Sequence, residues 1–177
     1  MVRCITICAF VALVAGCSSS SSDSEDTWSA ESQVLGKELA DVGFTRRYVR
    51  QCIEGDRAVA VILVNRIVDH GGGLHTETIR QIHFRAMNVL RPGSDERGGS
   101  IFDYPWFALV PRPGVDASEV QEKGILLVTL TFSSQGWPES ERVVVLEKAD
   151  DPRVGELQRM IDEMASSKTH KRQPWER

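Results

Sequence analysis

The chain has 177 residues, 41% of them hydrophobic, with 25 acidic and 21 basic side chains and a formal net charge of −4. This length suits one ordinary domain with a modest core. The net negative charge and the lack of a clustered basic face argue against a nucleic-acid-binding protein. We therefore expect a single domain and no nucleic-acid partner.

Residues 1–16 have the pattern of a secretory signal peptide. Arg3 supplies a positive charge, and residues 5–14 form an apolar run in which only Thr6 is polar. The run is shorter than the roughly 18 to 20 residues that a membrane-spanning helix needs, which excludes a permanent transmembrane segment here. We expect this segment to direct export rather than to fold.

Four residues at the end of the run resemble the lipobox of bacterial lipoproteins: Val14, Ala15, Gly16 and Cys17. In that family the lipoprotein signal peptidase cleaves before the cysteine, which becomes the acylated first residue of the mature chain. The resemblance implies membrane attachment through Cys17, and two or more acyl chains anchor stably. By the same resemblance, Ser18 in place of aspartate implies the outer membrane, with the domain facing the periplasm. The alternative is an ordinary signal peptide followed by a chance cysteine.

Residues 17–27 are rich in serine and acidic side chains and contain no aliphatic residue, which predicts a disordered tether. Eleven steps separate Cys17 from Trp28. At about 3.3 to 3.6 Å per residue, the tether then spans at most roughly 40 Å.

Cysteine usage predicts a fold without disulfide bonds. Cys4 and Cys8 leave with the signal peptide and Cys17 is acylated, so Cys52 remains alone in an oxidising compartment. We expect Cys52 to be a buried thiol rather than a reactive one.

Two helices are predicted at the start of the domain. The first covers residues 28–42 before a glycine cap at Gly43, and it has one apolar stripe: Val34, Leu35, Leu39 and Val42. The second covers residues 45–53, ends at Gly55 and carries Cys52 on its apolar face.

Residues 57–65 are rich in valine and isoleucine, which predicts a central strand buried on both faces. After a glycine-rich loop, Thr76 is placed to cap a helix that ends before Pro92. The apolar residues of this segment recur at helical spacing: Ile79, Ile82, Ala86, Met87 and Leu90. Strand, loop and helix in this order predict the start of an α/β unit.

Three further strands and a last helix complete the predicted elements. Residues 106–110 predict a short strand that its flanking prolines confine to an edge or a strand end. Residues 125–132 and 142–147 predict an antiparallel hairpin. Asp151 and Pro152 then start a helix with one apolar stripe: Val154, Leu157, Ile161 and Met164.

These elements predict an α/β domain of the α+β kind at residues 28–166, with a flexible basic tail at 167–177. Its sheet has about four strands, is mixed or mostly antiparallel, and packs with helices.

The string from His70 to Gly73 matches the HGGG motif that shapes an oxyanion hole in one esterase family. That family also needs a GxSxG nucleophile turn, which the sequence does not contain. We therefore interpret the glycines as a turn with positive φ angles.

His70, His75 and His83 are three of the four histidines and lie close together in the sequence. Imidazole is a ligand for zinc or copper, so these three residues are a candidate metal or small-ligand site. The alternative is solvated histidines or histidines at the core edge, and we predict no cofactor.

Three aromatic residues lie near prolines, and we expect them at the edge of the core rather than in an exposed patch: Trp106, Phe107 and Trp137.

Residues 117–165 resemble the hairpin and helix of TonB C-terminal domains, with Gly124 before the first strand and Gly136 in the turn. That family's following strand and inner-membrane helix are not matched. Residues 58–90 are similar to the strand, asparagine-arginine pair and helix of the lipoprotein activators of penicillin-binding proteins. The long linker of those proteins is not matched, and neither resemblance assigns a role to a residue.

No convergent set of nucleophile, base and oxyanion donors emerges from the sequence. The predicted function is therefore a non-catalytic accessory or adaptor, attached to the membrane through Cys17, that binds another envelope protein. A lipoprotein that binds a metal or small ligand through His70, His75 and His83 is the alternative.

Overall fold

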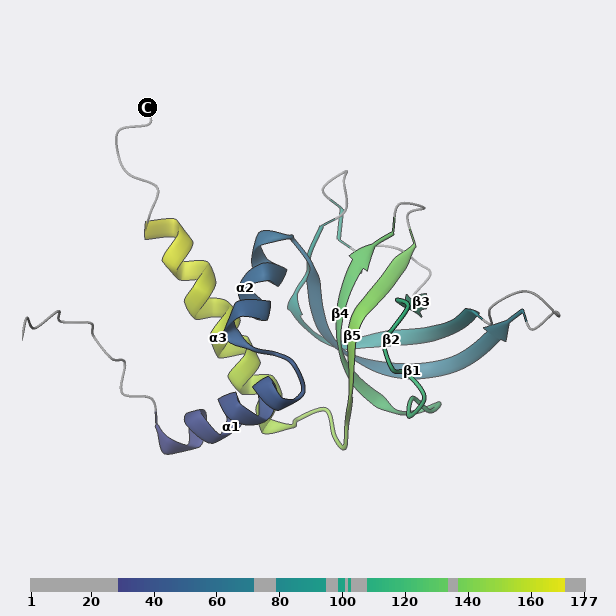
Figure 1. The fold of residues 1–177 in the computed structure, drawn as a ribbon, viewed down its shortest axis with the longest axis horizontal. Coiled ribbons are helices and arrows are strands. Elements are labelled where there is room, and N and C mark those ends of the chain that lie inside the picture. The colour runs from purple at the N-terminus through teal and green to yellow at the C-terminus, as the bar shows by residue number, and fades with distance from the viewer. Residues whose placement is uncertain are drawn as a thin grey trace, which may run out of the picture.

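The computed structural model describes residues 29–71, 79–94, 99–100, 102, 108–133 and 137–170. These residues form three helices and five strands (Figure 1). The helices are α1 (Ala30–Asp41), α2 (Arg46–Glu54) and α3 (Pro152–His170). The strands are β1 (Ala58–His70), β2 (Ile79–Arg91), β3 (Ala108–Pro111), β4 (Ile125–Phe132) and β5 (Pro138–Leu146). The α+β class with helices packed on a mixed sheet is confirmed, with five strands instead of about four.

The strands form a closed barrel in the order β1-β2-β3-β5-β4. Neighbouring strands are antiparallel except for β3 and β5, which are parallel. Small five-stranded barrels of this kind are typified by the OB-fold, an architecture shared by proteins of different functions. The contact between β3 and β5 that completes the barrel is short, because β3 pairs with β5 only at Glu139 and Ser140.

Two apolar clusters lie on the two faces of β1 and β4. One cluster fills the barrel and includes Ala60, Ile62, Phe84, Leu126 and Val128. The other lies between the outer face of the barrel and the helices, and includes Val59, Val61, Leu127, Leu39 and Leu157. Successive side chains of a strand point to opposite faces, so β1 contributes to both clusters. The predicted burial of this strand on both faces is confirmed.

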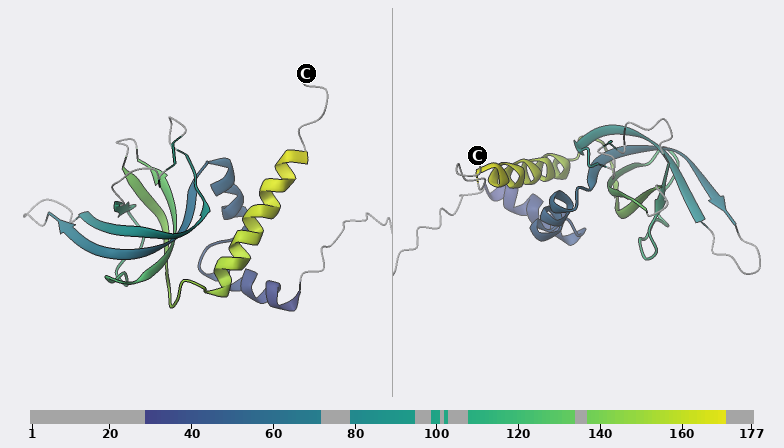
Figure 2. Two further views of the ribbon diagram at one scale, coloured as in Figure 1. Left: turned by 180° about the vertical axis from the view of Figure 1, so that it is seen from behind. Right: turned by 90° about the horizontal axis from the view of Figure 1, so that it is seen from above.

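The three helices lie together on one side of the barrel (Figures 1 and 2). On the other side, the β1–β2 ribbon extends beyond the barrel, away from the helices. Register shifts interrupt the β1–β2 pairing in three places. Such bulges bend a strand, and the bent β1 pairs with β2 on one side and with β4 on the other.

The prediction of a helix capped by Thr76 is wrong. Residues 79–91 are strand β2, which pairs with β1 from Ile79 opposite His70 to Arg91 opposite Val59. Ile79 and Met87, which the helix would have placed on its apolar stripe, are 54% and 44% exposed. The expected α/β unit is therefore a β-hairpin.

The sequence of β2 fits both periods, which explains the error. Ile82 and Phe84 alternate and are buried inside the barrel, as a strand requires. Ile82, Ala86 and Leu90 also recur every four residues, as in a helix. The long partner strand β1 decides between these patterns, because it supplies ladder bonds that a helix could not use.

The other predicted elements are present, but β1 continues to His70, past residue 65, and β5 begins at Pro138 instead of residue 142. Thr45 caps α2 by accepting the N–H of Tyr48 at 3.2 Å, and Gly55 ends this helix. The hairpin of β4 and β5 is confirmed. The stripe of α1 is only partly buried, because Leu39 is inaccessible while Val34 is 58% exposed.

The end of the chain and one aromatic residue also differ from expectation. α3 continues to His170, past residue 166. Trp137 is 54% exposed, so its expected burial is wrong. None of the described helices combines the length and apolar composition needed to cross a membrane.

Candidate functional site

The predicted lipidation residues lie outside the part of the chain that the structure describes: Val14, Ala15, Gly16 and Cys17. His75, Trp106 and Phe107 also lie outside it. Lipidation of Cys17 therefore stays a prediction.

His70 and His83 lie on neighbouring strands but are not brought together. His70 stands opposite Ile79, and its Nε2 lies 2.8 Å from Oε1 of Gln81. His83 stands opposite Arg66, four residues before His70 in β1, so the two histidines are about 13 Å apart along the ladder. Among the described residues, no group of three His, Cys, Asp or Glu side chains is suited to a metal ion.

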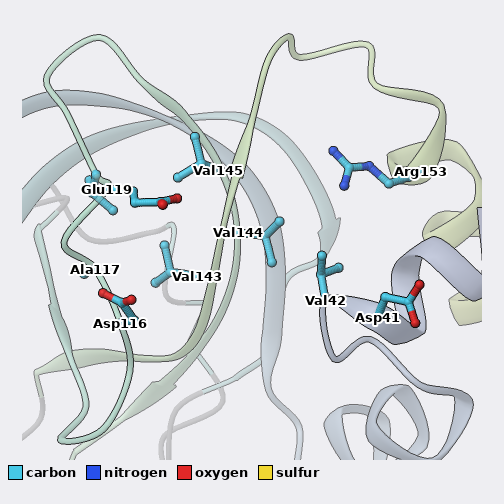
Figure 3. Close-up of a pocket in the computed structure, with 10 residues that line it drawn as sticks. Asp41, Val42, Asp116, Ala117, Glu119, Val143, Val144, Val145 and Arg153 are labelled. Atoms are coloured by element: carbon cyan, nitrogen blue, oxygen red, sulfur yellow. The ribbon is translucent and has the colours of Figure 1, made fainter.

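A groove of about 640 Å³ opens between the barrel and the helical layer (Figure 3). Four parts of the chain line it: Asp41 and Val42 at the end of α1, residues 116–120 between β3 and β4, residues 143–145 of β5, and Arg153 at the start of α3. A smaller hollow shares Glu119 and Val145 with it and extends it toward the start of β4. The groove thus runs along β5.

β5 has a backbone edge on this groove that no described strand pairs beyond Ser140. On one side it pairs with β4 along its whole length. On the other side, pairing with β3 stops at Ser140, because β3 ends at Pro111. Residues 141–146 therefore have no strand partner on that side within the described part of the chain.

The hydrogen-bond pattern identifies the backbone groups that face the groove. The N–H of Val64 donates to the carbonyl of Gly124, just before β4. Because the direction of backbone groups alternates along a strand, the even-numbered residues of β4 bond to β1 and the odd-numbered residues face β5. The N–H of Ser133, just after β4, donates to the carbonyl of Trp137, just before β5, which agrees with odd-numbered residues bonding to β5. The bonded pairs of the β4–β5 ladder are then Ile125 with Leu146, Leu127 with Val144, and Thr129 with Arg142.

The residues between these pairs point the other way. Val143 and Val145 direct their N–H and C=O groups away from β4, onto the groove. No described residue forms a hydrogen bond with these groups. The N–H of Arg112 bonds to the Ser140 carbonyl at 3.0 Å, so the same edge is paired just before the groove begins.

Valine side chains form the apolar part of the groove. Val143 and Val145 lie toward the side of Ala117 and Glu119, whereas Val144 lies toward Val42 (Figure 3). Val145, the last residue of β5 but one, is 43% exposed. The groove therefore presents aliphatic surface beside unpaired backbone.

The rim of the groove is acidic. Asp41 and Glu119 are exposed, and neither forms an ion pair in the described structure. Asp116 accepts hydrogen bonds from the N–H and the hydroxyl of Ser118 at 2.9 and 2.6 Å, which holds the pKa of its carboxyl below the usual value. The lowered pKa keeps the Asp116 carboxylate charged at neutral pH.

Arg153, the one cation among the described residues that line the groove, is already paired. Nη2 of Arg153 lies 2.7 Å from Oδ2 of Asp151, and Nε lies 2.9 Å from Oδ1. This pairing lowers the pKa of Asp151 and raises that of Arg153. Asp151 thus neutralises Arg153, and the groove keeps a net negative charge.

Arg142 holds the helical wall of the groove against β5. Its Nη1 donates to the Val42 carbonyl at 3.2 Å, and its guanidinium lies over the ring of Tyr48. The hydroxyls of Tyr48 and Thr129 are 2.7 Å apart, which adds a second link between α2 and the barrel. The wall is therefore fixed by specific polar contacts.

Behind this wall, Cys52 is buried at 1% exposure, as predicted. Burial raises the pKa of its thiol, and burial also raises the pKa of the neighbouring Tyr48 phenol. A protonated, inaccessible thiol is a weak nucleophile. Cys52 serves the packing of α2 and does not line the groove.

Sequence reasoning missed the groove, although one signal for it was present. Pro111 and Pro113 end β3 early, whereas the valines at 143–145 continue β5. Only the strand order shows that these two strands are neighbours.

A scan against protein-family models found no match, and a search of curated proteins found none either.

Proposed function

We propose that this protein is a lipid-anchored, periplasm-facing lipoprotein of the outer membrane that acts as a non-catalytic adaptor for another envelope protein. The segment that ends in Cys17 supports the anchor, because its short apolar run and small residues resemble a lipobox. Acyl chains on Cys17 would hold the domain at the membrane.

The groove along β5 is the observation that carries the adaptor proposal. It is open, it has aliphatic side chains along its length, and it presents the unpaired backbone groups of Val143 and Val145. These features suit a polypeptide segment, since small-molecule sites usually enclose most of their ligand.

The tether would limit where the partner lies. From Cys17 to Trp28 the chain spans at most roughly 40 Å when fully stretched. The domain would then act on a protein of the same membrane or one that reaches within this distance.

Substitution of Cys17 tests the anchor. We expect Cys17→Ser to move the protein from the membrane fraction to the soluble periplasmic fraction, whereas the matched change Cys4→Ser in the signal segment leaves it in the membrane fraction. Cell fractionation with mass measurement of the mature form is the readout. A normally processed Cys17→Ser protein that stays wholly with membranes would refute attachment through this residue.

In-cell crosslinking tests the adaptor role. A photoreactive amino acid at Glu119 should crosslink to an envelope protein, whereas the same group at Glu54, at the far end of α2, should not. The identity of the crosslinked protein is read by mass spectrometry. Equal yields at Glu119 and Glu54, or no crosslinks from any surface position of the membrane-bound protein, would contradict the proposal.

A further inference from the structure

We propose that residues 141–146 of β5 accept an extended segment of the partner protein as an additional strand. This segment carries alternating aliphatic side chains flanked by Lys or Arg. The inference rests on the proposed adaptor function and deepens it, because it states how the partner binds and what chemistry the partner segment must have.

The backbone of β5 is prepared for an added strand. Two N–H and two C=O groups, those of Val143 and Val145, face the groove without a hydrogen-bond partner among the described residues. The Arg112 N–H already pairs with the same edge at Ser140, so an added strand would continue the line that β3 begins. Main-chain bonds of this kind supply the affinity in strand addition.

This edge is not protected in the ways that proteins commonly use. Exposed edges usually carry lysine, proline or a bulge that prevents further pairing. Here three consecutive valines occupy the edge, and the bulge of β5 lies earlier, between Ser140 and Arg142. β-branched residues favour extended pairing. The edge is therefore open for pairing at the point where the groove exposes it.

The two walls of the groove would read the side chains of the added strand. Neighbours across a strand pair lie on the same face. Side chains next to Val143 and Val145 would contact Ala117, and those next to Val144 would contact Val42 (Figure 3). Both contacts favour aliphatic side chains.

The acidic rim selects the charge of the partner. Asp41, Asp116 and Glu119 attract Lys or Arg at the ends of the segment, and Arg153 does not offset them because Asp151 pairs with it. The same carboxylates disfavour a second copy of this chain, because edge-to-edge pairing of two copies would bring both acidic rims together. Charge complementarity thus points to a different protein.

Synthetic peptides provide the test with a defined probe. The peptide Lys-Val-Thr-Val-Thr-Val-Lys, labelled with a fluorophore, is titrated with the full lipidated chain in detergent, and anisotropy reports binding. We expect saturable binding that weakens as salt is added, and binding weaker by about tenfold or more for the version with Glu at both ends. A version with proline at the central valine should not bind. Equal affinity for all three peptides, or no binding, would overturn the inference.

Variants of the protein locate the binding. Val145→Pro removes an N–H that forms no hydrogen bond with any described residue, so the chain should stay folded by circular dichroism and lose peptide binding. Val145→Thr keeps that N–H and should bind within about threefold of wild type. Glu119→Lys, on the exposed rim, should weaken binding of the Lys-flanked peptide by about tenfold, with Glu54→Lys as the matched control. Unchanged binding in Val145→Pro and Glu119→Lys would overturn the proposal.

Amide exchange tests the free edge without any ligand. The amides of Val143 and Val145 should exchange faster than those of Val144 and Leu146, and they should become protected when the peptide binds. Equal protection in the free chain would show that the edge is already paired and would overturn the inference.

Sedimentation separates the partner from a second copy. A dimer in wild type that Val145→Pro converts to a monomer would assign the edge to self-association and refute a different partner. Crosslinks at surfaces away from the groove, together with absent peptide binding, would refute only this inference and leave the adaptor function in place.

Discussion

The guanidinium carbon of Arg142 lies 4.5 Å from the ring centre of Tyr48, and this contact joins β5 to α2. A cation over an aromatic face contributes roughly 0.5 to 2 kcal/mol, depending on burial. The same side chain donates to the Val42 carbonyl, so one residue of the strand holds both the α1–α2 connection and the first turns of α2. Arg142 therefore links the edge strand of the groove to its helical wall.

Gly43 should be required for this arrangement. Its φ is +89°, and a Cβ at this position would overlap the guanidinium of Arg142. We expect Gly43→Ala to lower the free energy of unfolding by about 1 to 3 kcal/mol. Gly36→Ala, inside α1 with open space around it, should instead raise the free energy by up to about 1 kcal/mol. Urea denaturation of both variants is the measurement, and a Gly43→Ala midpoint at or above that of wild type would contradict the contact.

The packing of α3 on the helical core predicts a large effect for Leu157. Its side chain is inaccessible, so Leu157→Ala should cost about 2 to 5 kcal/mol. Ile161→Ala, at 4% exposure, should fall in the same range. Val34→Ala on the exposed side of α1 is the control and should change stability by less than about 0.5 kcal/mol. Denaturant midpoints that are equal for Leu157→Ala and Val34→Ala would show that α3 does not pack as described.

Asp151 should make stability depend on pH. Its carboxylate accepts the N–H of Arg153 at 3.0 Å and pairs with the Arg153 guanidinium, which lowers its pKa in the folded state. A lowered folded pKa means that this stabilisation is present above the unfolded pKa, about 3.9, and is lost as the pH falls through the folded pKa.

We therefore expect Asp151→Asn, which keeps a helix-capping acceptor but loses the charge, to cost about 1 kcal/mol at pH 7. The difference between the wild type and this variant should shrink below pH 4. Urea denaturation from pH 7 to pH 2.5 measures it, and a difference that does not vary over this range would rule out the charge as its source.

Cys52 should be protected from alkylation in the folded chain. Burial raises the pKa of its thiol and keeps the reagent out. If access needs a local opening that costs about 3 kcal/mol, iodoacetamide should modify Cys52 about 100-fold more slowly in buffer than in 8 M urea. Mass spectrometry of the peptide that contains Cys52 gives the rate independently of other cysteines. Similar rates in both solvents would mean that α2 does not cover this thiol.

Local signals in the sequence determined all three described helices and four of the five described strands. Thr45 and Asp151 cap their helices through bonds to nearby N–H groups, and such bonds depend only on residues a few positions apart. The valine- and isoleucine-rich run at the start of β1 has the composition of a strand buried on both faces. The prediction of Cys17 as a lipidated residue is also local, since a short motif carries it.

Tertiary structure decided what these signals left open. Residues 79–91 are a strand because β1 offers a partner along their whole length, although Ile82, Ala86 and Leu90 also recur at helical spacing. The distance between His70 and His83 follows from the same pairing. The groove required even more, because the free edge at Val143 and Val145 exists only where a short β3 lies beside a longer β5. Strand order is set by contacts between residues far apart in the chain, and no local pattern in the sequence contains that information.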